Sequence, residues 1–148
     1  MPSRQCGQCP STGHQDVVDT RWLRPLLPRR LRAYVRNPEE IQMGSPQYGR
    51  LILDGRAISR PLSIEARSLL WSDDGTRLAA QELVSPREPF STRVVVFDTR
   101  ERSTIASSSP RAGIADPLRF ERDVLVYRNW HHTAGEHELR LTIDATTT

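Results

Sequence analysis

Three stretches of this 148-residue chain end in the same way, with a strand-like run closed by an aspartate. They cover residues 50–54, 94–98 and 140–144. The closing aspartates lie 44 and then 46 residues apart, and an apolar pair lies 17 to 20 residues before each aspartate. The aromatic residues ahead of these pairs are Trp22, Trp71 and Phe120. A period of this size with strand-like content predicts a repeated β-sheet unit.

The composition agrees with a β-rich domain. Eleven prolines and eight glycines indicate many turns, and 148 residues can bury a hydrophobic core. No run approaches the ~18 apolar residues of a membrane span, and the first residues show no secretory signal. We therefore expect a cytoplasmic protein that does not bind a membrane.

The chain divides into a tail and one domain. Residues 1–19 are rich in small and polar residues and predict a flexible N-terminal tail. Residues 20–148 predict a single β-rich domain with units at about 20–60, 66–108 and 116–144. The net charge of +3 is uneven, because residues 1–36 carry +5 and the remainder carries −2.

The second unit has the clearest strand pattern. Strands are predicted at residues 68–71, 76–83, 93–97 and 103–107, with Asp74-Gly75 in the first turn as a strong hairpin signal. For the first unit we expect extended pieces at 22–23, 31–35 and 48–53, with a loop at 37–47. For the third unit we expect strands at 118–120, 123–130 and 137–143, with loops at 108–115 and 131–136.

The apolar patterns of the strands differ. The runs 51–53, 94–97 and 124–127 are continuously apolar, which predicts strands covered on both faces. The last strand alternates, with Leu139, Leu141 and Ile143 between Arg140 and Thr142. Because side chains alternate across a strand, this sheet should pack on one face only, as a terminal cap does in a stack of repeats.

Residues 70–79 read Leu-Trp-Ser-Asp-Asp-Gly-Thr-Arg-Leu-Ala, and residues 95–99 read Val-Val-Phe-Asp-Thr. These segments resemble the turn and the third strand of a blade in WD40-like β-propeller repeats of the bacterial TolB type. The third unit has Phe120 in place of the tryptophan and lacks the Asp-Gly, and the first unit matches in spacing and at residues 51–54. The resemblance implies structural motifs that carry no catalytic residues.

A propeller needs about 4–8 blades to close, so about three antiparallel propeller-blade-like hairpin units are too few to close a ring alone. The chain could be a fragment, a degenerate relative, a partner that completes its ring by association, or a differently folded β domain. We expect a non-catalytic protein–protein interaction or binding module, with an unknown protein partner or with self-association.

An arginine-rich segment gives the alternative function. Arginines beside aromatic residues can hold phosphates and stack on bases, so this segment predicts binding of nucleic acid or another polyanion. The other interpretation is a solvated edge whose arginines pair with acids. The segment comprises Arg21, Arg24, Arg29, Arg30, Arg32 and Arg36, with Trp22 and Tyr34.

The tail contains a candidate zinc site. Cys6, Cys9 and His14 approach the spacing of a zinc knuckle, with Asp19 in the place of the fourth ligand. Two cysteines, a histidine and an aspartate are an unusual set for a structural zinc site, and a tail with a chance Cys-x-x-Cys explains the same residues. We therefore expect no metal and no cofactor.

Other candidate chemistry has simple structural explanations. His131, His132 and His137 surround one hairpin loop, and neighbours in a strand would point to opposite faces, so we expect a polar loop. Residues 73–75 predict a turn and lack the ligand spacing of a calcium loop. Residues 107–109 are serines without a histidine nearby in the sequence, and no nucleophile elbow, P-loop or Rossmann pattern occurs. An enzyme is therefore the third and least favoured interpretation, and a triad of residues distant in sequence stays open.

Overall fold

The computed structural model describes residues 31–60 and 63–144, and every regular element in these ranges is a β-strand. The twelve strands are β1 (Ala33–Glu40), β2 (Gln47–Leu53), β3 (Arg56–Ala57), β4 (Ile64–Glu65), β5 (Leu70–Trp71), β6 (Arg77–Ser85), β7 (Ser91–Asp98), β8 (Ser103–Ser107), β9 (Arg111–Ala112), β10 (Ile114–Glu121), β11 (Val124–His131) and β12 (Gly135–Thr142).

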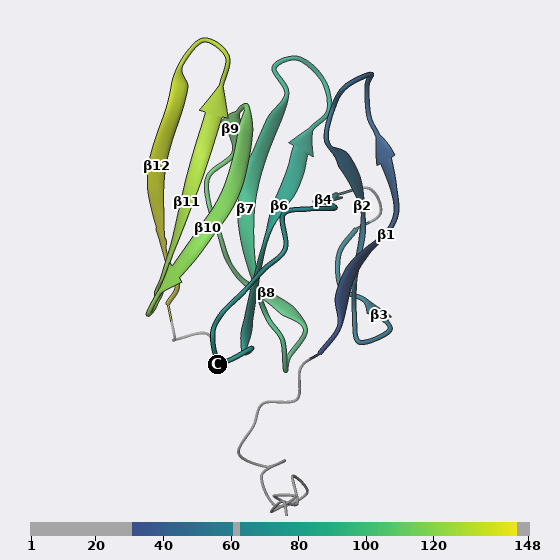
Figure 1. Ribbon diagram of the computed structural model, residues 1–148, viewed down its shortest axis with the longest axis vertical. Helices are drawn as coiled ribbons and strands as arrows, with labels where there is room; N and C mark the ends of the chain where they lie inside the picture. Colours follow the sequence, from purple (N-terminus) through teal and green to yellow (C-terminus); the bar gives the residue numbers. More distant parts are fainter. Residues whose placement is uncertain (1–30, 61–62, 145–148) are drawn as a thin grey trace, which may run out of the picture.

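The strands form two open antiparallel sheets. One has nine strands, in the order β1-β2-β4-β6-β7-β8 with β3, β5 and β9 alongside, and the other has the order β10-β11-β12. Three groups of strands stand side by side in Figure 1: β1 with β2, β6 with β7, and β10 with β11 and β12. The prediction of an all-β fold of hairpin units that does not close is confirmed.

The predicted second unit is present as four consecutively paired strands. β5 pairs with β6, β6 with β7, and β7 with β8, and β8 covers the predicted residues 103–107. Gly75, at the predicted turn, has a φ of 71°, a conformation that is free of strain only for glycine. Its N–H donates to the carbonyl of Ser72 at 3.0 Å, which closes the turn between β5 and β6.

The predicted loop at 37–47 is partly wrong, because β1 continues to Glu40. The register shifts between Arg36 and Glu39, and Asn37 has a φ of 46°. Pro38 lacks the N–H that an inner strand needs, and it is tolerated because β1 is an edge strand with a bulge at this point. Asn37 and Pro38 therefore lie within a strand, in a segment that was predicted to be a loop.

The predicted loops of the third unit are also too long. The segment 108–115 contains β9 and the first residues of β10, and the segment 131–136 shrinks to the three residues between β11 and β12. β10 carries Pro117 within an edge strand, next to a register shift between Pro117 and Arg119. A bulge on an edge again lets a strand include a proline.

The first and second units belong to one sheet, which the sequence did not predict. β4 is only two residues long, but it joins them, since Ile64 is opposite both Gly49 of β2 and Glu82 of β6. Leu51 of β2 packs in one cluster with Val95 and Phe97 of β7. The β1–β2 pair therefore covers one face of the β6–β7 pair.

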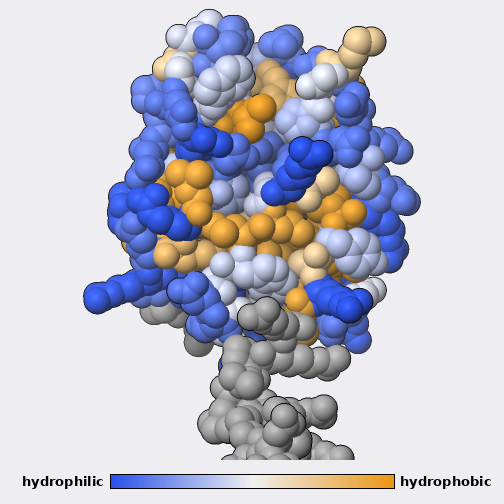
Figure 2. All heavy atoms as spheres, in the orientation of Figure 1, coloured by the Kyte–Doolittle hydropathy of each residue, from blue (hydrophilic) through white to orange (hydrophobic). Residues whose placement is uncertain are grey.

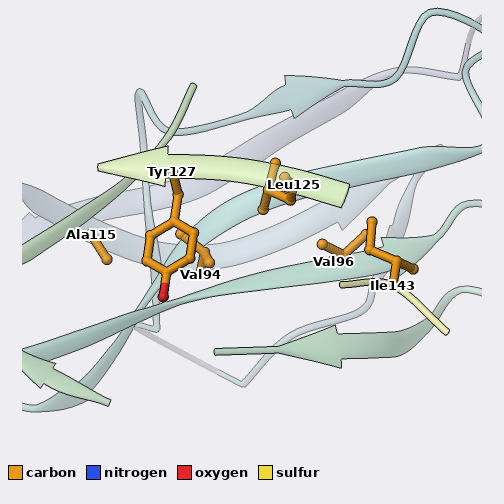
Figure 3. Close-up of a cluster of buried hydrophobic side chains, with 7 residues drawn as sticks. Val94, Val96, Ala115, Leu125, Tyr127 and Ile143 are labelled. Carbon is orange, nitrogen blue, oxygen red and sulfur yellow. The ribbon is translucent and has the colours of Figure 1, made fainter. Parts of the chain in front are cut away.

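The other face of the β6–β7 pair packs against the three-stranded sheet. Val94 and Val96 of β7 form a cluster with Leu125 and Tyr127 of β11 and with Ile143, as Figure 3 shows. Residues 94–97 thus alternate between two cores, and all four are buried. The prediction that this apolar strand is covered on both faces is confirmed.

The three-stranded sheet has one packed and one exposed face, as its alternation predicted. Leu139 and Leu141 pack against the core, whereas Arg140 and Thr142 are exposed. On the outer face Glu121 pairs with Arg140 at 2.6 Å and with Arg119 at 2.8 Å. Val126 of β11 is opposite Arg119 of β10 on one side and Arg140 of β12 on the other. It is buried because arginine stems can cover apolar side chains.

Candidate functional site

Two adjoining clefts lie where the three groups of strands meet. The inner cleft, of about 460 Å³, is lined by Glu65 and Gln81 of the large sheet and by Asp116, Leu118 and Arg128 of the three-stranded sheet. The second cleft, of about 250 Å³, is lined in part by Met43, Phe90, Trp130 and His131. Both clefts include Pro46 and Ile114, so they adjoin at these residues, and we call the two clefts together the groove.

The second cleft lies among hairpin loops, and we call it the loop-end cleft. Its lining comes from the β1–β2 loop, the β6–β7 loop and the end of β11. In Figure 1 these three segments lie at the same end of the molecule. Met43 is 99% exposed and Trp130 is 47% exposed. Exposed aromatic and methionine side chains are typical of protein interfaces.

The inner cleft has a polar floor made of linked side chains. The Tyr48 hydroxyl donates to Gln81 Oε1, and Gln81 Nε2 donates to Asp116 Oδ1 at 3.0 Å. Tyr48 and Gln81 are fully buried, and burial raises the pKa of Tyr48, with further contributions from Glu65 and Asp116. The tyrosine is therefore a fixed donor that orients the Gln81 amide towards Asp116.

Glu65 is the second carboxylate of the inner cleft. It lies in β4, opposite Tyr48 of β2, and only 8% of its surface is exposed. Its Oε2 accepts the backbone N–H of Arg67 at 2.9 Å. Burial raises the pKa of Glu65 and the nearby Asp116 adds to this effect, whereas the backbone N–H groups of Arg67 and Ser68 and the charge of Arg67 oppose it.

The described part of the predicted polyanion site lies on β1 and on the residue before it. Arg32, Tyr34 and Arg36 alternate along the chain and are exposed, and Arg50 of β2 is opposite Arg36 in register. Arg36 Nη2 donates to the Tyr34 hydroxyl at 3.4 Å. These residues share one face of the β1–β2 pair. Arg21, Trp22, Arg24, Arg29 and Arg30 lie outside the described residues.

The candidate zinc ligands Cys6, Cys9, His14 and Asp19 also lie outside the described residues, as does the whole tail 1–19. Within 31–60 and 63–144, no three His, Cys, Asp or Glu side chains are grouped so that they could hold a metal ion.

The prediction that neighbouring histidines 131 and 132 point apart is wrong. Their rings stand 4.3 Å apart, because β11 ends at His131 and His132 lies in the turn. His137 is on β12, where its Nε2 contacts the Ala134 carbonyl at 2.8 Å.

Two other sequence candidates have local structural roles. Asp74 accepts hydrogen bonds from Ser72 and Thr76 within the turn between β5 and β6. Ser108 Oγ accepts the backbone N–H of Val94 at 3.0 Å and so extends the pairing of β7. Both residues thus stabilise the backbone of the second unit.

Sequence reasoning missed the polar residues that line the inner cleft, which include Arg67 and Ser68. Glu65, Gln81, Asp116 and Arg128 are far apart in the chain and belong to four different strands, so no spacing connects them. One signal was present, because Gln81 follows Leu78, Ala79 and Ala80 in a strand that reads as buried. A polar residue in such a run requires a hydrogen-bonding partner.

No protein-family model, curated protein or solved structure matches this chain. In the described ranges no helix has the length and apolar character needed to cross a membrane.

Proposed function

We propose that this protein is a non-catalytic binding module, and that it holds a segment of a partner protein in the groove formed by the inner and loop-end clefts. The observation that carries this proposal is that both clefts share Pro46 and Ile114 and take their walls from all three groups of strands. Ligands commonly bind where several elements converge on a concave surface.

Exposed apolar residues at the groove support a protein partner. Trp130 and Met43 line the loop-end cleft and Leu118 lines the inner cleft, and all three are exposed large hydrophobic side chains. Figure 2 shows a band of hydrophobic residues across one face of the molecule, with hydrophilic residues above and below. Contiguous apolar surface of this kind is a feature of interaction sites.

A random-peptide display library provides defined probes for this function. We expect enriched peptides whose affinity, measured by fluorescence polarisation, falls about tenfold or more in Trp130→Ser, as for a central aromatic anchor. Val84→Ser is the matched control, because Val84 is also exposed but lines neither cleft. An absence of enriched peptides, or equal losses in the two variants, would contradict a protein-binding groove.

The second candidate function is polyanion binding by the outer face of β1 and β2. Arg32, Tyr34 and Arg36 lie on this face with Arg50, and among the described residues none of these arginines forms an ion pair. An arginine face with an exposed tyrosine can contact phosphates and stack on a base.

Salt dependence separates the two functions. A fluorescent single-stranded oligonucleotide bound by this face should dissociate steeply with added salt, because binding releases counterions. The double substitution Arg36→Glu with Arg50→Glu should abolish that binding, whereas Arg87→Glu, on the β6–β7 loop, should change it little. Binding that is insensitive to salt and to the double substitution would exclude this function.

A further inference from the structure

The outer edge of β12 differs from the other sheet edges in the described part of the chain. β1 and β10, which also end their sheets, each contain a proline and a register shift, and β8 has only five residues. β12 has eight residues and no proline, and it pairs with β11 at every position from Gly135 to Thr142. Prolines, bulges and short strands keep sheet edges from pairing with other chains, so β12 is the edge that another strand can join.

The backbone groups on this edge belong to alternate residues. Ile143 donates its N–H to the Asp123 carbonyl at 2.7 Å, so every second residue before Ile143 also directs its N–H and C=O groups towards β11. The N–H and C=O groups of residues 136, 138, 140 and 142 therefore point away from β11, towards the edge that is outermost in Figure 1. The side chains of the same residues are exposed on the outer face of the sheet.

The charges of β12 fit a second copy of the same strand. In an antiparallel pair of two β12 strands, residues with outward backbone groups must be opposite each other, because only they can exchange hydrogen bonds. A register centred on Glu138 or on Arg140 places like charges opposite each other, which is destabilising. The register centred on Leu139, at the middle of the strand, places each Glu138 opposite Arg140 of the second copy. Edge charges that would repel other strands therefore select this one.

Both charged side chains can keep their present partners in this register. Glu138 contacts Arg119 through Oε1 at 3.1 Å, and Arg140 contacts Glu121 through Nη2 at 2.6 Å. The side chains of Glu138 and Arg140 are 55% and 56% exposed, so their remaining oxygen and nitrogen atoms can face the second copy. Opposite charges then alternate across the contact, and such a network stabilises more than an isolated surface pair.

We propose that two copies of this protein associate through their β12 edges, antiparallel about a two-fold axis at Leu139, so that the three-stranded sheet continues from one copy into the other. On the inner face Leu139, which is partly exposed in one copy, meets its counterpart. The contact goes beyond the proposed function, because β12 lines neither cleft. A single strand pair is a small interface, so we expect a reversible dimer with a dissociation constant on the order of 1 μM or weaker.

Sedimentation velocity over a series of protein concentrations measures this association. We expect a concentration-dependent dimer for the wild type, and a dissociation constant about tenfold or more weaker in Glu138→Arg and in Arg140→Glu, since each change places like charges opposite each other at both symmetric positions. Glu101→Arg and Arg87→Glu are the matched controls. They make the same charge changes at exposed positions outside β12 and should associate as the wild type does.

A mixture of the two β12 variants separates charge pairing from damage to the fold. In Glu138→Arg both positions are arginine, and in Arg140→Glu both are glutamate, so each variant repels itself and attracts the other. We expect an equimolar mixture to form a heterodimer about as tightly as the wild type forms its dimer. Recovery in the mixture also shows that both variants are folded.

A wild type that stays monomeric at about 1 mM, far above the expected dissociation constant, would overturn the inference and leave the proposed function untouched. Unchanged association in both β12 variants, or a mixture that associates no better than its separate components, would also overturn it. A dimer that is lost in Trp130→Ser but kept in both β12 variants would place the contact at the loop-end cleft and overturn the β12 pairing.

Discussion

Asp74 shows how one side chain fixes a turn of this protein. Its Oδ1 accepts the Thr76 N–H at 3.0 Å, the Thr76 hydroxyl at 2.7 Å and the Ser72 hydroxyl at 2.8 Å. These hydrogen bonds lower the pKa of Asp74 to about 2, and the bond from the Thr76 backbone contributes most. The ionised carboxylate therefore stabilises the fold.

We predict that Asp74→Ala lowers the thermal midpoint at neutral pH, whereas Asp73→Ala, at the exposed neighbouring position, changes it little. Because the pKa of Asp74 is depressed from its usual 3.8, its contribution is present above that value and is lost as the pH falls towards 2. Thermal unfolding at several pH values should show the difference from wild type shrinking in this window. A difference that does not vary with pH would contradict the role of the carboxylate.

Glu65 has the opposite linkage to pH. Its pKa is raised above the usual 4.5 by burial, so the folded state binds this proton more tightly than the unfolded state does. The stabilising effect is complete at low pH and is lost as the pH rises through the folded-state pKa.

We predict that Glu65→Gln is more stable than wild type at neutral pH and that this gain disappears in acid. Chemical denaturation at neutral pH and below pH 4.5 measures both values. A loss of stability at neutral pH would mean that the Glu65 charge is compensated within the protein.

At the scale of elements, the junction of β9 and β10 requires a glycine. Gly113 has a φ of 98°, and a Cβ at this position would lie 2.1 Å from the Trp130 carbonyl oxygen. Gly135, at the start of β12, has a φ of 76°, but no atom lies within 4 Å of its Cβ position. The two glycines share a backbone conformation and differ in the space around them.

We predict that Gly113→Ala destabilises the protein much more than Gly135→Ala. The second change should cost about 1 kcal/mol of backbone strain, while the first must also move β10 away from β11. Denaturant titration of both variants gives the comparison. Similar losses would show that backbone conformation alone sets the cost at these positions.

The two faces of β12 should respond differently to the same substitution. Leu141→Asp places a charge against the core beneath the three-stranded sheet and should cost on the order of 3 kcal/mol or more, enough to unfold a marginal domain. Arg140→Asp changes only an exposed ion pair with Glu121 and should leave the thermal midpoint nearly unchanged. Equal damage would indicate that another subunit covers the outer face.

At the scale of the whole molecule, the sequence predicted the hairpins better than their assembly. The run at 94–97 and the Asp-Gly turn predicted β7 and the β5–β6 hairpin because strand burial and turn geometry are local properties. β4 was missed because two residues, Ile64 and Glu65, carry no periodicity, although they join two units. The groove was missed because its polar residues meet only after three groups of strands have packed.

The binding of a partner segment in the groove is the central claim, and an NMR titration tests it most directly. A peptide selected by display, added to ¹⁵N-labelled protein, should shift the amide signals of residues 67–70, Gln81, Ile114, Asp116 and Leu118, which line the inner cleft. Signals of residues 33–36 and 50–52, on β1 and β2, should not move. Shifts confined to β1 and β2, or no shifts at all, would contradict the claim.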